Sequence, residues 1–172
     1  ETAAMVSLSD YSVHESAALT SEDITNEGSQ AAFSFSGIAD GNYRLVSPKA
    51  EVSEAGVTFS VPSAQTQETP GISGNRLFLV GGAKGSAEGQ LADITVGDGN
   101  SSCNAYFRLA GALLKFNVFS STAGGTEQIR SISVSAESAQ IAGDMTVGFD
   151  GAVAPVKGTG HEVTVSVGTP EI

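Results

Sequence analysis

Two stretches in the middle of the chain decide the expected fold: AYFRLAGALLKFNVF at residues 105–119 and IRSISVSAESAQIAGDMTVGF at residues 129–149. In the first stretch, Leu114, Phe116 and Val118 fall on one side of an extended chain, and the intervening residues fall on the other. A period of two is typical of a β-strand, in which successive side chains point to opposite faces. The first stretch therefore predicts a strand.

The same alternation returns after a glycine-rich turn at residues 122–126, first over 132–136 and then over 145–149. This succession predicts a meander of three antiparallel strands. Residues 113–119 are largely apolar on both sides. A strand with two apolar faces is one that is covered on both, so we expect this strand to be central.

Outside these stretches, short alternating segments recur between turn residues such as the Asp-Gly-Asn at 40–42. This pattern predicts an all-β fold, a Greek-key sandwich of about 7–10 strands with no helix. Even Ser21-Glu22-Asp23, which could cap a helical turn, is predicted to be loop. The further predicted strands lie at Met5–Ser9, Tyr11–Val13, Ala32–Phe35, Tyr43–Val46, Val57–Val61, Arg76–Val80, Leu91–Val96, Ala152–Val156 and Val163–Val167.

The 172 residues carry 19 acidic and 8 basic side chains, for a net charge of −11. Such a chain repels phosphate backbones, so nucleic acid and anionic membranes are not expected partners. Charged residues make up only 16%, below the roughly 25% of average globular domains. A Ser, Thr and Gly-rich chain of low charge is common among secreted β-proteins. No apolar run is long enough for a membrane-spanning helix.

We expect residues 1–30 to form a short strand and a polar loop that belong to the same domain as a sandwich at residues 31–172. The chain starts with Glu1 rather than Met, which favours a processed or truncated chain. Thr169-Pro170 after the last strand is typical of a linker. We therefore expect a second domain to follow this one in the full-length protein.

No group of residues predicts a metal or thiol site. His14 and His161 lie far apart in polar segments, and surface histidines are the expected outcome. Asp98-Gly99-Asn100-Ser101-Ser102 alternates oxygen ligands as calcium loops do, but it has no distal carboxylate, so a turn is expected. Cys103 is the only cysteine, and we expect a small buried side chain rather than a reactive thiol.

Catalytic patterns are equally weak. No Gly-x-Ser-x-Gly motif is present, and Gly81-Gly82-Ala83-Lys84-Gly85 has no Ser or Thr after its lysine, so it predicts a hairpin loop rather than a phosphate loop. We predict no catalytic, cofactor-binding or metal-binding residue and no enzymatic activity. The phenylalanines of the alternating segments are predicted to be core: Phe33, Phe35, Phe59, Phe78, Phe107, Phe116 and Phe149.

Several segments in succession resemble the fimbrillin-like proteins of Bacteroidales, the subunit family of type V pili. The resemblance covers roughly residues 40–150, and it lies in the order of the segments rather than in any one motif. These segments are VTFSVPSAQTQ at 57–67, LFLV at 77–80, LLKFNVFSS at 113–121, EQIRSISVS at 127–135 and IAGDMTV at 141–147.

The resemblance implies a transthyretin-like β-sandwich that serves as the N-terminal domain of a fimbrial subunit. It implies export as a lipoprotein precursor to the outer-membrane cell surface. It also implies assembly with other pilus subunits by β-strand addition, in which one subunit's sheet edge accepts an extended segment of another. Such a subunit needs no active site and no cofactor.

Two other functions stay open. A sandwich also suits a surface lipoprotein that binds carbohydrate or a host ligand as an adhesin. Such a module would present Tyr11, Tyr43 or Tyr106 in a concave patch. A hydrolase with paired carboxylates is the third alternative, because its two acidic groups can lie far apart in sequence.

Overall fold

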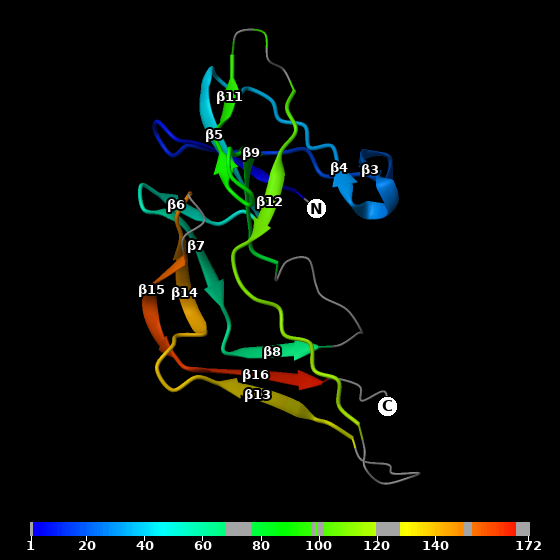
Figure 1. The fold of residues 1–172 in the computed structure, drawn as a ribbon, viewed down its shortest axis with the longest axis vertical. Coiled ribbons are helices and arrows are strands. Elements are labelled where there is room, and N and C mark those ends of the chain that lie inside the picture. The colour runs from blue at the N-terminus through cyan, green and yellow to red at the C-terminus, as the bar shows by residue number, and fades with distance from the viewer. Residues whose placement is uncertain are drawn as a thin grey trace. The chain divides into compact units, whose positions relative to one another are not determined.

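The computed structural model describes residues 2–67, 77–97, 99, 102–119, 128–149 and 153–167, with only the backbone for 153–159. These residues form sixteen strands and two three-residue 3₁₀ turns (Figure 1). The elements are β1 (Ala4–Ser7), β2 (Val13–Glu15), η1 (Ser21–Asp23), β3 (Ile24–Thr25), η2 (Asn26–Gly28), β4 (Gln30–Ala31), β5 (Gly41–Ser47), β6 (Glu51–Ser53), β7 (Gly56–Val61), β8 (Ala64–Gln67), β9 (Leu79–Lys84), β10 (Leu91–Ala92), β11 (Ile94–Val96), β12 (Tyr106–Leu109), β13 (Ser131–Ser135), β14 (Ala142–Val147), β15 (Val153–Gly160) and β16 (Glu162–Val167).

The prediction of an all-β sandwich is confirmed. The strands are more numerous than the predicted 7–10 because six of them have only two or three residues. The largest sheet has the order β10-β9-β5-β1-β2, with β11 also paired to β5 and β12 to β9. The others are β15-β14-β7-β6, β13-β16-β8 and β3-β4.

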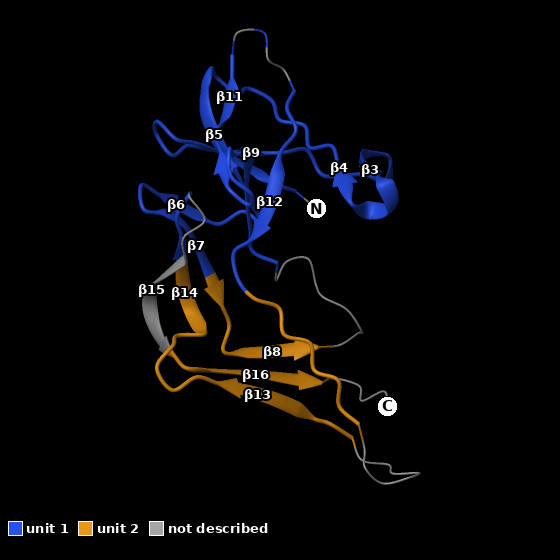
Figure 2. Ribbon diagram, in the orientation of Figure 1, with its two compact units in different colours: residues 1–59, 73–111, 146–154 blue, residues 60–72, 112–145, 155–172 orange. Residues whose placement is uncertain are grey.

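The chain divides into two compact units, coloured separately in Figure 2. Unit 1 comprises residues 1–59, 73–111 and 146–154, and unit 2 comprises residues 60–72, 112–145 and 155–172. The expectation that residues 1–30 belong to the same domain as a sandwich at residues 31–172 stays a prediction.

Unit 1 holds two hydrophobic clusters, one on each side of the large sheet. The first joins Ala4, Val6 and Val46 of that sheet to Val57 and Phe59 of β7. The second joins Met5, Tyr43, Leu45 and Ile94, and it packs against the partly buried Phe35 and Ile38. Neighbours in sequence thus enter opposite clusters, as the period of a strand requires.

The doubly covered strands are β1 and β5, and the prediction that residues 105–119 form the central strand is wrong. All four residues of β1 are buried, as are Tyr43 to Val46 of β5. In the predicted stretch only Tyr106–Leu109 form a strand, β12, and residues 111–119 are exposed and belong to no strand. The sequence pattern predicted a strand at residues 43–46 but did not indicate that it is central, because Arg44 makes that segment look half-polar.

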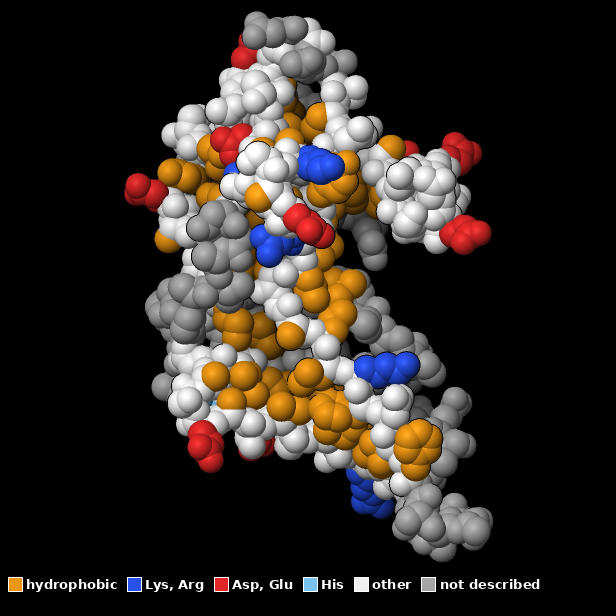
Figure 3. Space-filling model, viewed as in Figure 1, with side chains coloured by type: hydrophobic (Ala, Val, Ile, Leu, Met, Phe, Trp, Pro, Cys, Tyr) orange, Lys and Arg blue, Asp and Glu red, His pale blue; other side chains and the backbone are white. Residues whose placement is uncertain are grey.

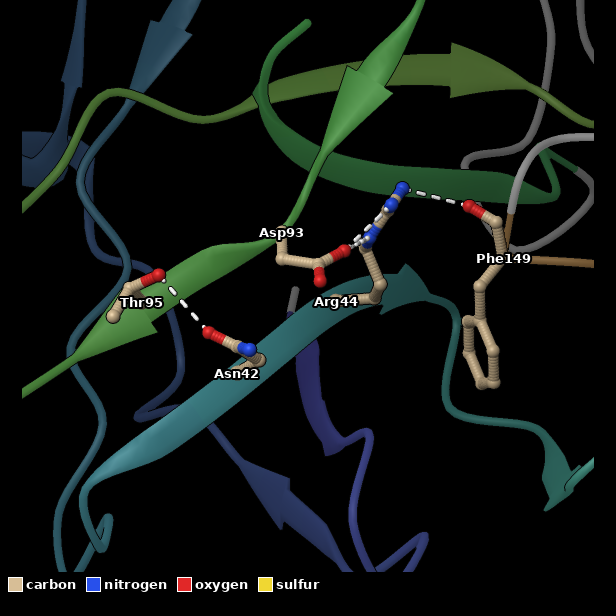
Figure 4. A network of polar contacts seen from close by, with 5 residues as sticks. All are labelled: Asn42, Arg44, Asp93, Thr95 and Phe149. Carbon is tan, nitrogen blue, oxygen red and sulfur yellow. Dashed lines mark hydrogen bonds and ion pairs between the residues drawn. The ribbon is translucent and has the colours of Figure 1, made fainter.

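Arg44 is buried in β5 because its charge and its N–H groups find partners (Figure 4). Its Nε and Nη2 atoms donate to Asp93 Oδ1 at 3.0 and 2.8 Å, and its Nη1 donates to the carbonyl of Phe149 at 2.7 Å. A buried guanidinium is tolerated where its hydrogen bonds are made. Arg44 thereby links Asp93, at the junction of β10 and β11, to Phe149 in the chain that follows β14.

The predicted three-strand meander is also wrong. β13 pairs with β16 and not with residues 113–119, and β14 lies in a different sheet. All strands have similar backbones, so alternation alone does not predict which strands pair with each other.

Several smaller predictions are corrected as well. Residues 32–35 are not a strand. Ser21–Asp23, predicted as loop, is the 3₁₀ turn η1, in which the amide and hydroxyl of Thr20 donate to Asp23 Oδ2 at 2.8 and 2.7 Å. These bonds lower the pKa of Asp23.

The glycine-rich segment at residues 81–85 is mostly strand, not a hairpin loop, because β9 continues to Lys84. Gly81 and Gly82 are buried where no side chain fits. A Cβ on Gly81 would lie 2.9 Å from the ring of Phe107, and one on Gly82 would lie 2.5 Å from the carbonyl oxygen of Ala92. These glycines therefore permit close packing across β9.

Candidate functional site

The candidate sites in this chain are places where strands could be added or exchanged. Among the described residues, no group of three or more His, Cys, Asp or Glu side chains could hold a metal ion. In the same part of the chain, no helix is long and apolar enough to cross a membrane. The candidate sites are therefore sheet edges and apolar segments that could bind a further strand.

The residues singled out from the sequence do not come together. His14 lies on β2 with its ring edge-on to Tyr43, at 6.4 Å between centroids, whereas His161 is exposed and its Nδ1 lies 2.9 Å from the carbonyl oxygen of Ala139. Asp98, Asn100 and Ser101 lie outside the described residues.

Cys103 is exposed, which corrects the expectation of a buried side chain. It lies between β11 and β12 in a segment that forms no strand, so no sheet face covers it.

The three tyrosines do not share a surface. Tyr43 is 3% exposed and donates a hydrogen bond to the carbonyl of Ala39 at 2.8 Å, so it belongs to the core. Tyr11 is half-buried and Tyr106 is 51% exposed. The adhesin alternative thus loses Tyr43 as a contact residue.

The first candidate site is the N-terminal hairpin of β1 and β2. β1 pairs with β2 on one side, where Met5 faces His14, and with β5 on the other, where Met5 faces Leu45. β2 is the edge of the sheet. The strand predicted at residues 5–13 is therefore a hairpin, and its inner strand supplies residues to both hydrophobic clusters.

Polar contacts close the hairpin at both ends. At the open end, Ser16 Oγ accepts a hydrogen bond from the amide of Ala3 at 3.0 Å, and the Ser16 amide donates to the carbonyl of Ala3 at 2.8 Å. At the turn, Asp10 accepts bonds from the amide and hydroxyl of Ser12 at 3.1 and 2.8 Å. The hairpin is thus closed by its own hydrogen bonds, and it joins the rest of the sheet where β1 pairs with β5.

The turn has a pH-sensitive group. Hydrogen bonds from the side chain of Ser7 and from the hydroxyl and amide of Ser12 lower the pKa of Asp10 to about 2. A carboxylate with a lowered pKa stabilises the fold fully above its unfolded pKa, here 3.8, and loses that contribution as the pH falls toward about 2.

We therefore expect the stability advantage of the natural chain over Asp10→Asn to be constant above pH 5 and to shrink between pH 4 and 2. Urea unfolding at half-unit pH steps measures this difference. The exposed Glu88→Gln serves as the control for a general loss of negative charge. An advantage that grows on acidification would contradict the assignment.

The second candidate site lies in unit 2, where residues 112–119 and the outer edge of β13 are both without a strand partner among the described residues. Phe116, predicted as core, is 51% exposed. The alternation of residues 113–119 predicted a strand, and that prediction is wrong, because these residues are exposed and form no strand.

No protein-family model, curated protein or solved structure matches this chain. The fold establishes the class of an all-β sandwich. The resemblance to fimbrillin-like proteins therefore stays a prediction.

Proposed function

We propose that this protein is a structural subunit of a bacterial cell-surface fimbria that assembles with other subunits by β-strand exchange. In this proposal it is exported as a lipoprotein precursor to the outer-membrane surface and acts without an active site. The observation that carries the proposal is the position of β1, a strand that is wholly buried yet attached through only one sheet neighbour besides its own hairpin partner.

Strand exchange needs a strand whose removal leaves an apolar groove with a free backbone edge. Ala4 and Val6 fill one cluster and Met5 fills the other, so loss of β1 would open both. It would also free the N–H and C=O groups of β5 between Tyr43 and Val46. An incoming strand with small or apolar residues at alternate positions would regain these contacts.

The geometry also supports displacement of the hairpin as one piece. The link from β2 to the rest of the chain passes through residues 17–20, which lie outside any strand. The ion pair of Lys49 with Glu15, at 3.4 Å, joins two exposed side chains and adds little to the attachment. The hairpin is thus attached mainly through β1, by its apolar contacts and its backbone pairing with β5.

The test introduces a specific protease site between Ala18 and Leu19, so that the folded chain can be cut after the hairpin. We expect a fluorescent peptide of residues 2–15 to replace the cut hairpin, and a Val6→Asp peptide to fail, because Val6 is fully buried. A peptide with Ser9→Ala, a change at an exposed position, is the matched control and should replace the hairpin as the natural peptide does.

The second arm of the test is assembly. Cut subunits that have been stripped of their hairpin should form end-to-end polymers with the full-length subunit, as seen by electron microscopy. A cut hairpin that never exchanges, together with subunits that never polymerise, would contradict the proposed function.

A further inference from the structure

Residues 112–119 form an apolar segment on the surface of unit 2. All eight residues are exposed and none belongs to a strand. Five large side chains are involved, and their exposed fractions are 50% for Leu113, 65% for Leu114, 51% for Phe116, 56% for Val118 and 86% for Phe119. Figure 3 shows hydrophobic side chains gathered on the surface in this part of the molecule. An exposed apolar run of this kind marks a surface that binds a partner or promotes aggregation.

In the same unit, β13 has a strand neighbour on one side only among the described residues, namely β16. The amide of Ala136 donates to the carbonyl of His161 at 2.8 Å, and the amide of Val167 donates to the carbonyl of Arg130 at 2.8 Å. In an antiparallel ladder the residues that bond to the neighbour alternate with residues that face away. The N–H and C=O groups of the three serines therefore point outward from the sheet, at Ser131, Ser133 and Ser135.

The segment and the edge have matching faces. Ile132 and Val134 are only half-buried, and they lie beside Val165 and Val163 of β16 on one face of the sheet. A strand added at β13 with its even-numbered residues opposite the even-numbered residues of β13 would place Leu114, Phe116 and Val118 on this face. Side chains that lie directly opposite each other on neighbouring strands are in contact, and such pairs stabilise a sheet.

The charge distribution favours a copy of the same chain as the partner. The chain has a net charge of −11, yet residues 111–119 contain only Lys115 as a charge, and residues 131–135 contain none. Two copies can therefore meet at these surfaces without bringing carboxylates together. Each chain carries both the apolar segment and the β13 edge, neither with a strand partner in the described part of the chain, so two copies can complement each other twice.

We propose that residues 113–119 of one copy add as a strand to the β13 edge of a second copy. This inference rests on the proposed function, since it takes strand addition between copies as the mode of contact, and it names a donor and an acceptor other than β1. Antiparallel pairing places Asn117 opposite Ser133, with Phe116 beside Val134. Parallel pairing with the same faces places Lys115 opposite Ser133.

Cross-linking between two differently tagged chains tests the proposal directly, in a Cys103→Ser background because Cys103 is exposed. One chain carries Asn117→Cys or Lys115→Cys, and the other carries Ser133→Cys. We expect a reducible mixed dimer from one of the two pairs. Cα atoms of opposed residues lie within the reach of a disulfide.

The matched control places the second cysteine at Ser166, which is exposed and faces Ser131 one strand further into the sheet. A residue opposite Ser133 is too far from it to be bridged, so this pair should form little mixed dimer. In a further arm of the experiment, one chain carries both cysteines, so that cross-links within a chain are detected as well. A cross-link that forms only within single chains, or no cross-link in any pair, would overturn the proposal.

Sedimentation of the uncut chain gives an independent measurement. We expect a dimer or larger assembly that Phe116→Lys weakens at least about 10-fold in Kd, because the side chain that should enter the new face becomes charged. Phe119→Lys is the matched control and should leave assembly nearly unchanged, because Phe119 lies on the opposite side of the segment. An unmodified chain that stays monomeric would overturn the proposal.

The salt response separates this contact from adventitious charge pairing. Assembly should strengthen as salt rises from low to physiological concentration, because the repulsion between acidic copies is screened and the apolar contact is retained. Weaker assembly at higher salt would overturn the proposal. Hairpin exchange in the cut chain with no contact at β13 would defeat this inference alone and leave the proposed function standing.

Discussion

Gly56→Ala is expected to lower the free energy of unfolding by about 4 kcal/mol, enough to unfold much of a marginally stable domain. Gly56 opens β7 with φ at +128° and is buried against β14. A Cβ at this position would lie 2.2 Å from the carbonyl oxygen of Val147, a backbone atom that cannot turn aside. Alanine would therefore strain the backbone and force the two strands apart.

The matched control is Gly89→Ala, in the turn between β9 and β10. Gly89 also has a positive φ, +72°, but nothing lies within 4 Å of its added Cβ. Its cost should be limited to the left-handed conformation, about 1 to 2 kcal/mol. Denaturant unfolding of the two variants measures the difference, and equal losses would show that the close approach to Val147 has no part in the effect.

Arg44→Met is expected to cost about 2 to 4 kcal/mol, the second largest effect. The variant fills much of the space in β5, but it leaves the carbonyl of Phe149 without its donor and Asp93 without its cation. Asp93→Asn should cost a comparable amount, because it leaves the guanidinium buried beside a neutral group. Asp93 itself is 40% exposed, so water stabilises its carboxylate in the Arg44 variant.

The double variant measures the coupling of this pair. We expect the double variant to lose less stability than the two single variants together. Once Arg44 and Asp93 are both replaced, no charged group is left without its partner. Lys49→Ala is the control, since its ion pair with Glu15 joins side chains that are 57% and 47% exposed, and its removal should change stability by less than about 0.5 kcal/mol. Strict additivity would show that Arg44 acts through packing alone.

Segments with strict alternation could be predicted from the sequence, because a period of two depends only on neighbouring residues. The strands at 43–46, 57–61 and 163–167 were expected and are found as parts of β5, β7 and β16. The hairpin of β1 and β2 was recognised only as a short strand, because alternation does not show which segments pair.

The candidate assembly surfaces were less predictable. The alternation of residues 113–119 was visible, yet it indicated a buried central strand, and the segment is exposed. An extended apolar strand and an extended apolar donor have the same sequence pattern. The open edge of β13 had no signal at all, because its outward groups are backbone N–H and C=O, which every residue but proline possesses.

The sequence by itself determined the all-β class, most strand positions and the acidic, weakly charged surface, because these follow from side-chain types and local spacing. The tertiary structure decided which strands pair and which faces are covered. It buried Arg44 in β5 through Asp93, paired β13 with β16 and left residues 111–119 without a strand. Those outcomes depend on competition among distant segments for the same hydrogen bonds and the same apolar area, which no local pattern records.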